Sequence, residues 1–178
     1  MYKFFKKVLW SLICITIILS LSVSVLKYLF PPSYYATLDK YCSKYGVDTY
    51  LALALAKAES NFDKEAVSRA GAKGIMQLTD DTFDFCTKNA KLENDDIFDP
   101  DTNIHAGVWY LSYLLKKYDG NTQNSLAAYN AGTGTVDKWL KDDSYSENGE
   151  TLSDIPYAET KRYTKKITQY RKIYNILY

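Results

Sequence analysis

The sequence has little that could bind a metal or form a disulfide framework. Its 178 residues include one histidine, His105, and three cysteines, and no Cys/His cluster has a spacing typical of zinc sites. Cys42 and Cys86 follow the apolar N-terminal segment and could pair in an oxidising compartment. Sequence cannot place their Cα atoms within bonding range, and we expect two free, buried thiols. The sequence therefore predicts no metal site.

The chain also lacks an excess of charge of either sign, with 22 basic and 21 acidic residues. Residues 31–178 hold 18 of the basic residues and all 21 acidic ones, a net charge near −3. No basic stripe of the kind that binds nucleic acid is present, so nucleic acid is not an expected partner. The glycines of "GAKG" lack the spacing and the lysine of a Walker phosphate-binding motif.

One long apolar run lies at the N-terminus. Three lysines precede 19 uncharged residues, 8–26, and one lysine, Lys27, follows them. That length is close to what spans a bilayer, and the lysine asymmetry favours a cytoplasmic N-terminus. We therefore expect a single-pass signal anchor over residues 1–30 that holds a domain of residues 31–178 at the cell membrane, outside the cytoplasm. Cleavage and secretion are the alternative, because "SLSVS" offers small residues, although no A-x-A site follows.

Helical apolar periodicity dominates residues 31–178, without internal repeats or a convincing alternating strand pattern. Caps, glycines and prolines divide this segment into helices, which we expect over about 34–45, 49–60, 81–90, 100–119, 125–131, 136–141 and 157–178. The segment is therefore predicted to be one all-α domain, with at most a minimal β-hairpin near residues 74–79.

A single carboxylate stands out at the end of an apolar helix. In "YLALALAKAESNFD", Glu59 follows Leu51 and Leu55 at a spacing of four, which places the three residues on one helical face. A buried, unpaired carboxylate is costly unless it is neutral or has partners. Glu59 is thus either a helix-terminal residue that bends into solvent or a general acid whose pKa is raised by apolar surroundings.

Several short polar motifs accompany Glu59. They read "ESNF", "AVSRAGAKGIMQL", "DPDTNIHAGVWYL", "AAYNAGTG" and "IPYAETKRYTKKI". Taken singly, their polar residues are typical of loops, helix caps and core rings. In this order, over roughly Leu51 to Tyr174, they resemble the soluble lytic transglycosylase family of peptidoglycan-cleaving enzymes. The chain departs from the family pattern at four positions that carry no catalytic group, Ile75, Thr133, Ala158 and Thr164.

The resemblance implies a fold, a reaction and a set of site residues. The fold would be the mainly helical goose-type lysozyme-like fold. The reaction would be non-hydrolytic cleavage of the MurNAc–GlcNAc β-1,4 bond, which leaves 1,6-anhydro-MurNAc ends. Glu59 would be the single general acid and base, without cofactor or metal. The residues that match the family's substrate-binding positions are Ser68, Met76, Gln77, Asn103, Tyr129, Asn130 and Tyr163.

Two other functions stay open at this point. A lysozyme-type hydrolase on the same fold would need a positioned water and a second carboxylate, with Glu159 or Asp63 as candidates. A membrane-tethered wall-binding module without turnover would not need Glu59. The expected partners are peptidoglycan glycan strands and the membrane, and a membrane-associated cell-wall or secretion complex is a further candidate.

Overall fold

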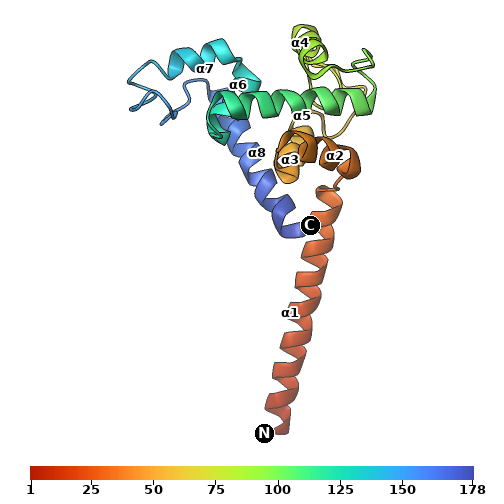
Figure 1. Ribbon diagram of the computed structural model, residues 1–178. Helices are drawn as coiled ribbons and strands as arrows, with labels where there is room; N and C mark the ends of the chain where they lie inside the picture. The colour runs from red at the N-terminus through yellow and green to blue at the C-terminus, as the bar shows by residue number, and fades with distance from the viewer.

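The regular structure of the chain is helical (Figure 1). The computed structural model describes the backbone of residues 1–178 and every side chain except those of Lys3 and Val8. The helices are α1 (Tyr2–Leu29), α2 (Tyr35–Tyr45), α3 (Thr49–Ser60), α4 (Asp80–Ala90), α5 (Pro100–Lys117), α6 (Thr122–Ala131), α7 (Thr133–Trp139) and α8 (Ala158–Leu177). The all-α prediction is confirmed, and the region near residues 74–79 contributes only isolated bridges, Val67 to Lys73 and Lys73 to Leu78.

Side-chain caps set the beginnings of the central helices. The carboxylate of Asp48 accepts hydrogen bonds from the backbone N–H groups of Tyr50 and Leu51, at 2.8 and 3.2 Å, as the sequence predicts for α3. Asp99 caps α5 in the same way, with Pro100 at the first helical position. Asn103 therefore lies inside α5 rather than at its start.

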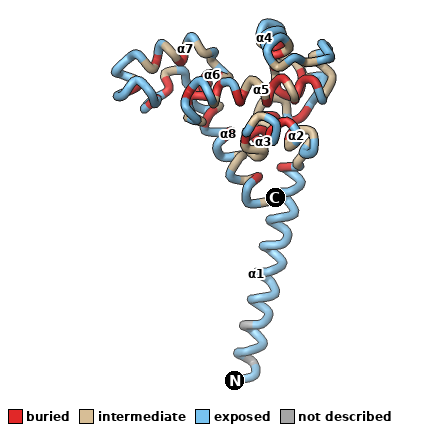
Figure 2. Tube along the Cα trace, in the orientation of Figure 1, coloured by how far each residue is buried: buried red, intermediate tan, exposed pale blue. Residues whose placement is uncertain are grey.

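The core lies where α3 and α5 meet their neighbours. α3 packs along α8 and against α2, while α5 packs against α2, α4 and α6 (Figure 1). Figure 2 shows buried residues concentrated in α3, α5 and α6. Six consecutive residues of α3, 51–56, are buried. The helix that carries Glu59 therefore starts within the core and reaches its edge.

The first helix, α1, extends away from the other helices, and those of its side chains that the structure describes are exposed (Figure 2). By length and composition alone, its segment from Phe4 to Leu29 could cross a membrane, a test that signal sequences also pass. Among the described elements, α1 packs against α8. The division of the chain into residues 1–30 and 31–178 stays a prediction.

The two cysteines of the domain are apart and free. Cys42 lies in α2 and Cys86 in α4, and both are fully buried. Burial raises the pKa of each thiol to about 12. At neutral pH both are therefore protonated core residues.

Candidate functional site

Glu59 lies one residue before the end of α3. Asn61 ends the helix with a left-handed backbone (φ 55°), and the chain then turns into the loop that leads to α4. Leu51 and Leu55, on the same helical face, are 2% and 0% exposed, whereas Glu59 is half-buried. This face of α3 therefore leads from the core to a site at its edge, with Glu59 in that site.

The carboxyl group of Glu59 is desolvated and has one close partner. The hydroxyl of Tyr163, in α8, donates a hydrogen bond to its Oε1 atom. Desolvation raises the pKa of Glu59 to about 7, against the smaller opposing effects of the Tyr163 hydrogen bond and the charge of Lys166. At neutral pH the protonated and ionised forms of Glu59 are thus both populated. This is the property required of a group that must donate and accept a proton.

The phenol groups of two half-buried tyrosines, Tyr129 and Tyr163, lie beside this carboxyl group. Burial, followed by the negative charge of Glu59, raises the pKa of both Tyr129 and Tyr163 well above its ordinary value. Both therefore stay protonated and act as hydrogen-bond donors. Tyr129 comes from the end of α6 and Tyr163 from the start of α8, so packing of these helices brings the rings together.

A chain of hydrogen bonds fixes Tyr129. Its hydroxyl donates to the backbone carbonyl of Met76 at 2.8 Å. The backbone N–H of Met76 in turn donates to the Asn103 Oδ1 atom at 2.8 Å, and the Asn103 amide donates to the carbonyls of Lys73 (3.2 Å) and Ile97 (2.8 Å). Asn103 is 1% exposed and Met76 is 0% exposed. Both residues therefore have a structural part in this structure, and any contact with a ligand stays a prediction.

Glycine at two positions lets the loop that carries Met76 approach α5 closely. A Cβ atom at Gly107 would lie 2.5 Å from the Cβ of Met76. A Cβ atom at Gly74 would overlap the Asn103 amide, and Gly74 also has a left-handed backbone (φ 72°). The loop that carries Met76 can therefore pack directly on α5.

The loop between α3 and α4 presents Ser68 and Gln77, both half-buried. The Ser68 hydroxyl accepts from the backbone N–H of Ala72 at 3.0 Å. The Gln77 amide nitrogen donates to the carbonyls of Ala66 (3.1 Å) and Gly74 (2.9 Å). Both side chains brace the loop in this structure, and any contact with a ligand stays a prediction.

Asn130 lies at the end of α6, directly after Tyr129. It is exposed, and its Oδ1 atom accepts a hydrogen bond from the hydroxyl of Thr160 at 2.7 Å. This bond ties the end of α6 to the first turn of α8, two residues beyond Ala158. Asn130 therefore helps to place Tyr129 and Tyr163 beside each other.

Lys166 also acts on the site, although it belongs to none of the predicted site residues. Its ammonium group donates to the Ala58 carbonyl at 3.0 Å and acts electrostatically on Glu59. The available signal was its position three residues after Tyr163, on the same helical face. Lys166 lowers the pKa of Glu59 and holds the end of α3 against α8.

Neither candidate for a second carboxylate joins the site. Glu159 and Asp63 are both exposed. Within the described side chains, the charged group that acts on Glu59 is Lys166, and no carboxylate does so. The geometry thus presents one acid with two phenols, a pattern that suits proton transfer by a single group.

The raised pKa of Glu59 predicts a specific dependence of stability on pH. Because the folded pKa, about 7, exceeds the unfolded value of 4.5, this group's contribution to stability is present below pH 4.5 and lost as pH rises through about 7. From pH 5 to pH 8 the native chain should lose about 2 kcal/mol in free energy of unfolding through this group. The Glu59→Gln variant should not show this loss, because glutamine does not titrate. Urea titrations at both pH values measure it. Glu159→Gln, at an exposed position, is the matched control, and the same absence of loss there would contradict the prediction.

Comparison with known proteins agrees with this geometry. Residues 37–151 match the family model described as the transglycosylase SLT domain. The chain is 31% identical over 150 residues to the soluble lytic murein transglycosylase of Escherichia coli (strain K12), covering 82% of this chain and 23% of that protein. It is 33% identical over 165 residues to the membrane-bound lytic murein transglycosylase C of Yersinia pestis (strain Pestoides F), covering 79% of this chain and 46% of that protein.

Solved structures show the same likeness. An inactive glutamate-to-glutamine mutant of the lytic transglycosylase Slt from Pseudomonas aeruginosa superposes with a TM-score of 0.76 at 32% identity, covering 85% of this chain and 25% of that one. The 70 kDa soluble lytic transglycosylase of Escherichia coli superposes with a TM-score of 0.76 at 29% identity and with the same coverage of both chains. That protein was also solved in complex with bulgecin A. The chain thus spans 23% of the length of the Escherichia coli relative and 46% of that of the Yersinia pestis relative.

Proposed function

The chain belongs to the transglycosylase SLT domain family, and on that premise we propose that it is a peptidoglycan lytic transglycosylase. The reaction is cleavage of the MurNAc–GlcNAc β-1,4 bond without water, which leaves 1,6-anhydro-MurNAc ends. The observation that carries the proposal is the carboxyl group of Glu59, which has a pKa of about 7, a hydrogen bond from Tyr163 and no second carboxylate acting on it within the described residues.

A single carboxyl group is sufficient if the substrate supplies the nucleophile. Protonated Glu59 donates its proton to the glycosidic oxygen as the bond from that oxygen to C1 of MurNAc breaks. The 6-hydroxyl oxygen of the same sugar bonds to C1, and the Glu59 carboxylate takes the proton that this hydroxyl loses. The cycle ends with Glu59 protonated again and no water consumed. Most glycosidases, in contrast, need two carboxylates.

The neighbouring side chains orient this exchange. The phenols of Tyr129 and Tyr163 remain protonated and flank the carboxyl group. Ser68 and Gln77 come from the loop between α3 and α4 and Asn130 from α6, and we assign them contacts with the sugar and its N-acetyl group. Holding the 6-hydroxyl against C1 in this way replaces a bimolecular attack by water with an intramolecular one. The inactive glutamate-to-glutamine mutant of the Pseudomonas aeruginosa relative supports an essential glutamate.

We further propose that α1 anchors the chain in the cell membrane and that residues 31–178 are the catalytic domain, outside the cytoplasm. The length and apolar composition of α1 and the membrane-bound relative from Yersinia pestis support this anchor. Its partners are then peptidoglycan strands close to the membrane. A complex with other membrane-associated cell-wall or secretion proteins is compatible with this position.

The products test the proposal. The full chain in detergent, incubated with purified peptidoglycan, should release fragments whose ends are lighter by one water than reducing ends, which mass spectrometry resolves. Reducing ends would show a hydrolase and direct attention to Glu159 and Asp63. Binding to peptidoglycan without release would show a wall-binding module.

A further inference from the structure

The end of α8 is fastened to the end of α1 (Figure 1). The hydroxyl of Tyr174 donates to the carbonyl of Pro31 and that of Tyr178 to the carbonyl of Phe30, both at 3.1 Å. The rings of Phe30 and Tyr174 pack edge to face, with centroids 5.7 Å apart. Since α1 ends at Leu29, the last turn of α8 lies level with that end. If α1 spans the membrane, this turn lies at the membrane surface.

The side chains at this level have the chemistry of a membrane interface. Ile176 is 82% exposed and Tyr178 is 44% exposed, although both belong to the end of a packed helix. Tyr28 is 85% exposed on the last turn of α1, and the ammonium of Lys27 lies 5.5 Å from the centre of the Tyr178 ring. Exposed tyrosines beside lysines are typical of the zone where a protein meets lipid headgroups.

Three lysines lie along one side of α8, leading away from this point. Ile167 and Tyr174 are buried and face the core. Helical spacing places another set of residues on the opposite side of α8. This set, which we name the outer face of α8, consists of Lys161, Lys165, Gln169, Lys172 and Ile176. The outer face therefore combines three cations with an apolar residue at the end nearest α1.

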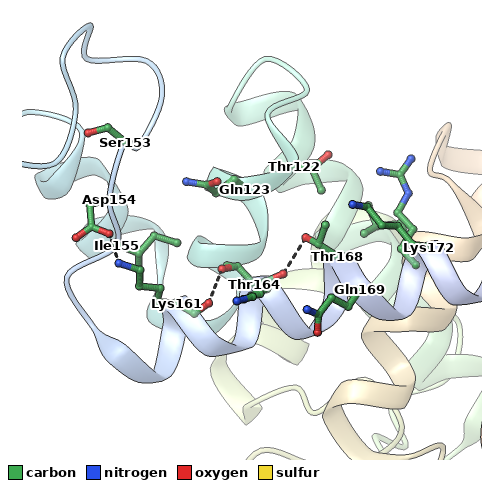
Figure 3. A pocket seen from close by; sticks show the side chains of 13 residues that line it. Thr122, Gln123, Ser153, Asp154, Ile155, Lys161, Thr164, Thr168, Gln169 and Lys172 are labelled. Carbon is green, nitrogen blue, oxygen red and sulfur yellow. Dashed lines mark hydrogen bonds and ion pairs between the residues drawn. The ribbon is translucent and has the colours of Figure 1, made fainter.

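A groove of about 610 Å³ lies along the outer face, between α8, the start of α6 and the loop before α8 (Figure 3). Within it, Lys161 forms an ion pair with Asp154 at 2.5 Å. Lys165 and Lys172 form no ion pair with any side chain that the structure describes. The groove thus offers two ammonium groups without counter-charges, which attract an anion.

We propose that the outer face of α8 binds the membrane, with Lys165 and Lys172 on anionic phospholipid headgroups and Ile176 inserted at the interface. The inference rests on the proposed membrane anchor, α1. Lipid fits better than a purely anionic polymer, because the cations adjoin an exposed apolar side chain and the end of the anchoring helix.

Two contacts would fix the orientation of the catalytic site. Anchoring by α1 alone would let the domain rotate relative to the membrane plane. Contacts through both α1 and α8 would hold the domain in one orientation. Tyr163, which bonds Glu59, belongs to the same helix as the proposed membrane contact. The membrane contact would therefore set the orientation in which Glu59 meets a glycan strand.

Position-resolved fluorescence quenching tests this contact. In the full chain carrying Cys14→Ser, an environment-sensitive fluorophore is attached at one of three introduced cysteines: Ile176→Cys, Leu19→Cys within α1, or Glu159→Cys at the exposed start of α8. The native Cys42 and Cys86 are buried and should not react. In vesicles of equal parts phosphatidylcholine and phosphatidylglycerol, spin-labelled lipid should quench positions 19 and 176 about threefold more than position 159.

The outcomes separate this inference from the proposals on which it rests. Strong quenching at position 19, together with equally weak quenching at positions 176 and 159, would overturn the proposed membrane contact of α8. That result would leave the proposed anchor, α1, intact. No quenching at 19 would overturn both. Cleavage products are measured independently, so failure of the proposed reaction would not resemble either result.

The charges are tested with a matched pair of double variants. Lys165→Gln with Lys172→Gln should reduce quenching at 176 to the level seen in pure phosphatidylcholine vesicles, whereas Lys88→Gln with Lys91→Gln, exposed positions at α4, should not. Full quenching in the first variant would overturn the headgroup assignment. An equal fluorescence change with inorganic polyphosphate and no vesicles would assign the outer face to a soluble polyanion instead.

Discussion

Glu59→Gln is expected to abolish glycan cleavage, lowering turnover on the order of 10³-fold, because glutamine can neither donate nor accept the proton that the reaction moves. Release of anhydro-MurNAc ends from purified peptidoglycan measures it. The fold should persist, since the glutamine Oε1 atom can still accept the hydrogen bond from Tyr163.

Two matched variants serve as controls. Glu159→Gln and Asp63→Asn alter exposed carboxylates outside the site, and both should keep near-native turnover. Loss of activity in either one, with Glu59→Gln still active, would remove Glu59 from its assigned role. Loss in both Glu59→Gln and one of the controls would favour the two-carboxylate mechanism of a hydrolase.

Asn103→Ala is expected to cause the largest loss of stability. The substitution removes three hydrogen bonds and leaves the Met76 N–H and the carbonyls of Lys73 and Ile97 without this partner in the interior. We expect a loss of about 3 kcal/mol in free energy of unfolding, seen as a fall in Tm of roughly 10 °C. Turnover should also fall, because the Met76 carbonyl holds the Tyr129 hydroxyl.

Asn89→Ala is the matched control for stability. Asn89 lies on α4, is exposed, and makes one local hydrogen bond to the carbonyl of Phe85. Its replacement should change the free energy of unfolding by less than about 0.5 kcal/mol. Similar losses for both asparagines would show that the Asn103 hydrogen bonds do not hold the loop on α5.

Local sequence signals predicted the helices well. Asp48 and the apolar run behind it define α3, because a capping carboxylate and helical spacing act over a few residues. The same spacing placed Glu59 at the edge of the core. The motif series identified the family, and through it a site that no single polar residue indicated.

Contacts between distant segments were beyond the sequence. Lys166 acts on Glu59 across more than 100 residues, and the Asn103 amide joins α5 to the buried loop that carries Met76. Each result depends on how close two helices pack, which side-chain spacing within one helix does not encode. The absence of a side chain at Gly107 matters only because the loop that carries Met76 packs against α5 at that position.

The sequence by itself determined that this chain is helical, that a long apolar run precedes the domain, and that one carboxylate ends an apolar helix, because periodicity, caps and composition are local properties. Only the tertiary structure decided the pKa of that carboxylate, since desolvation arises from burial in the folded chain and the Tyr163 hydrogen bond comes from α8, about a hundred residues away. It also decided that the end of α8 returns to the end of α1, because the hydrogen bonds of Tyr174 and Tyr178 join residues more than 140 positions apart in the sequence.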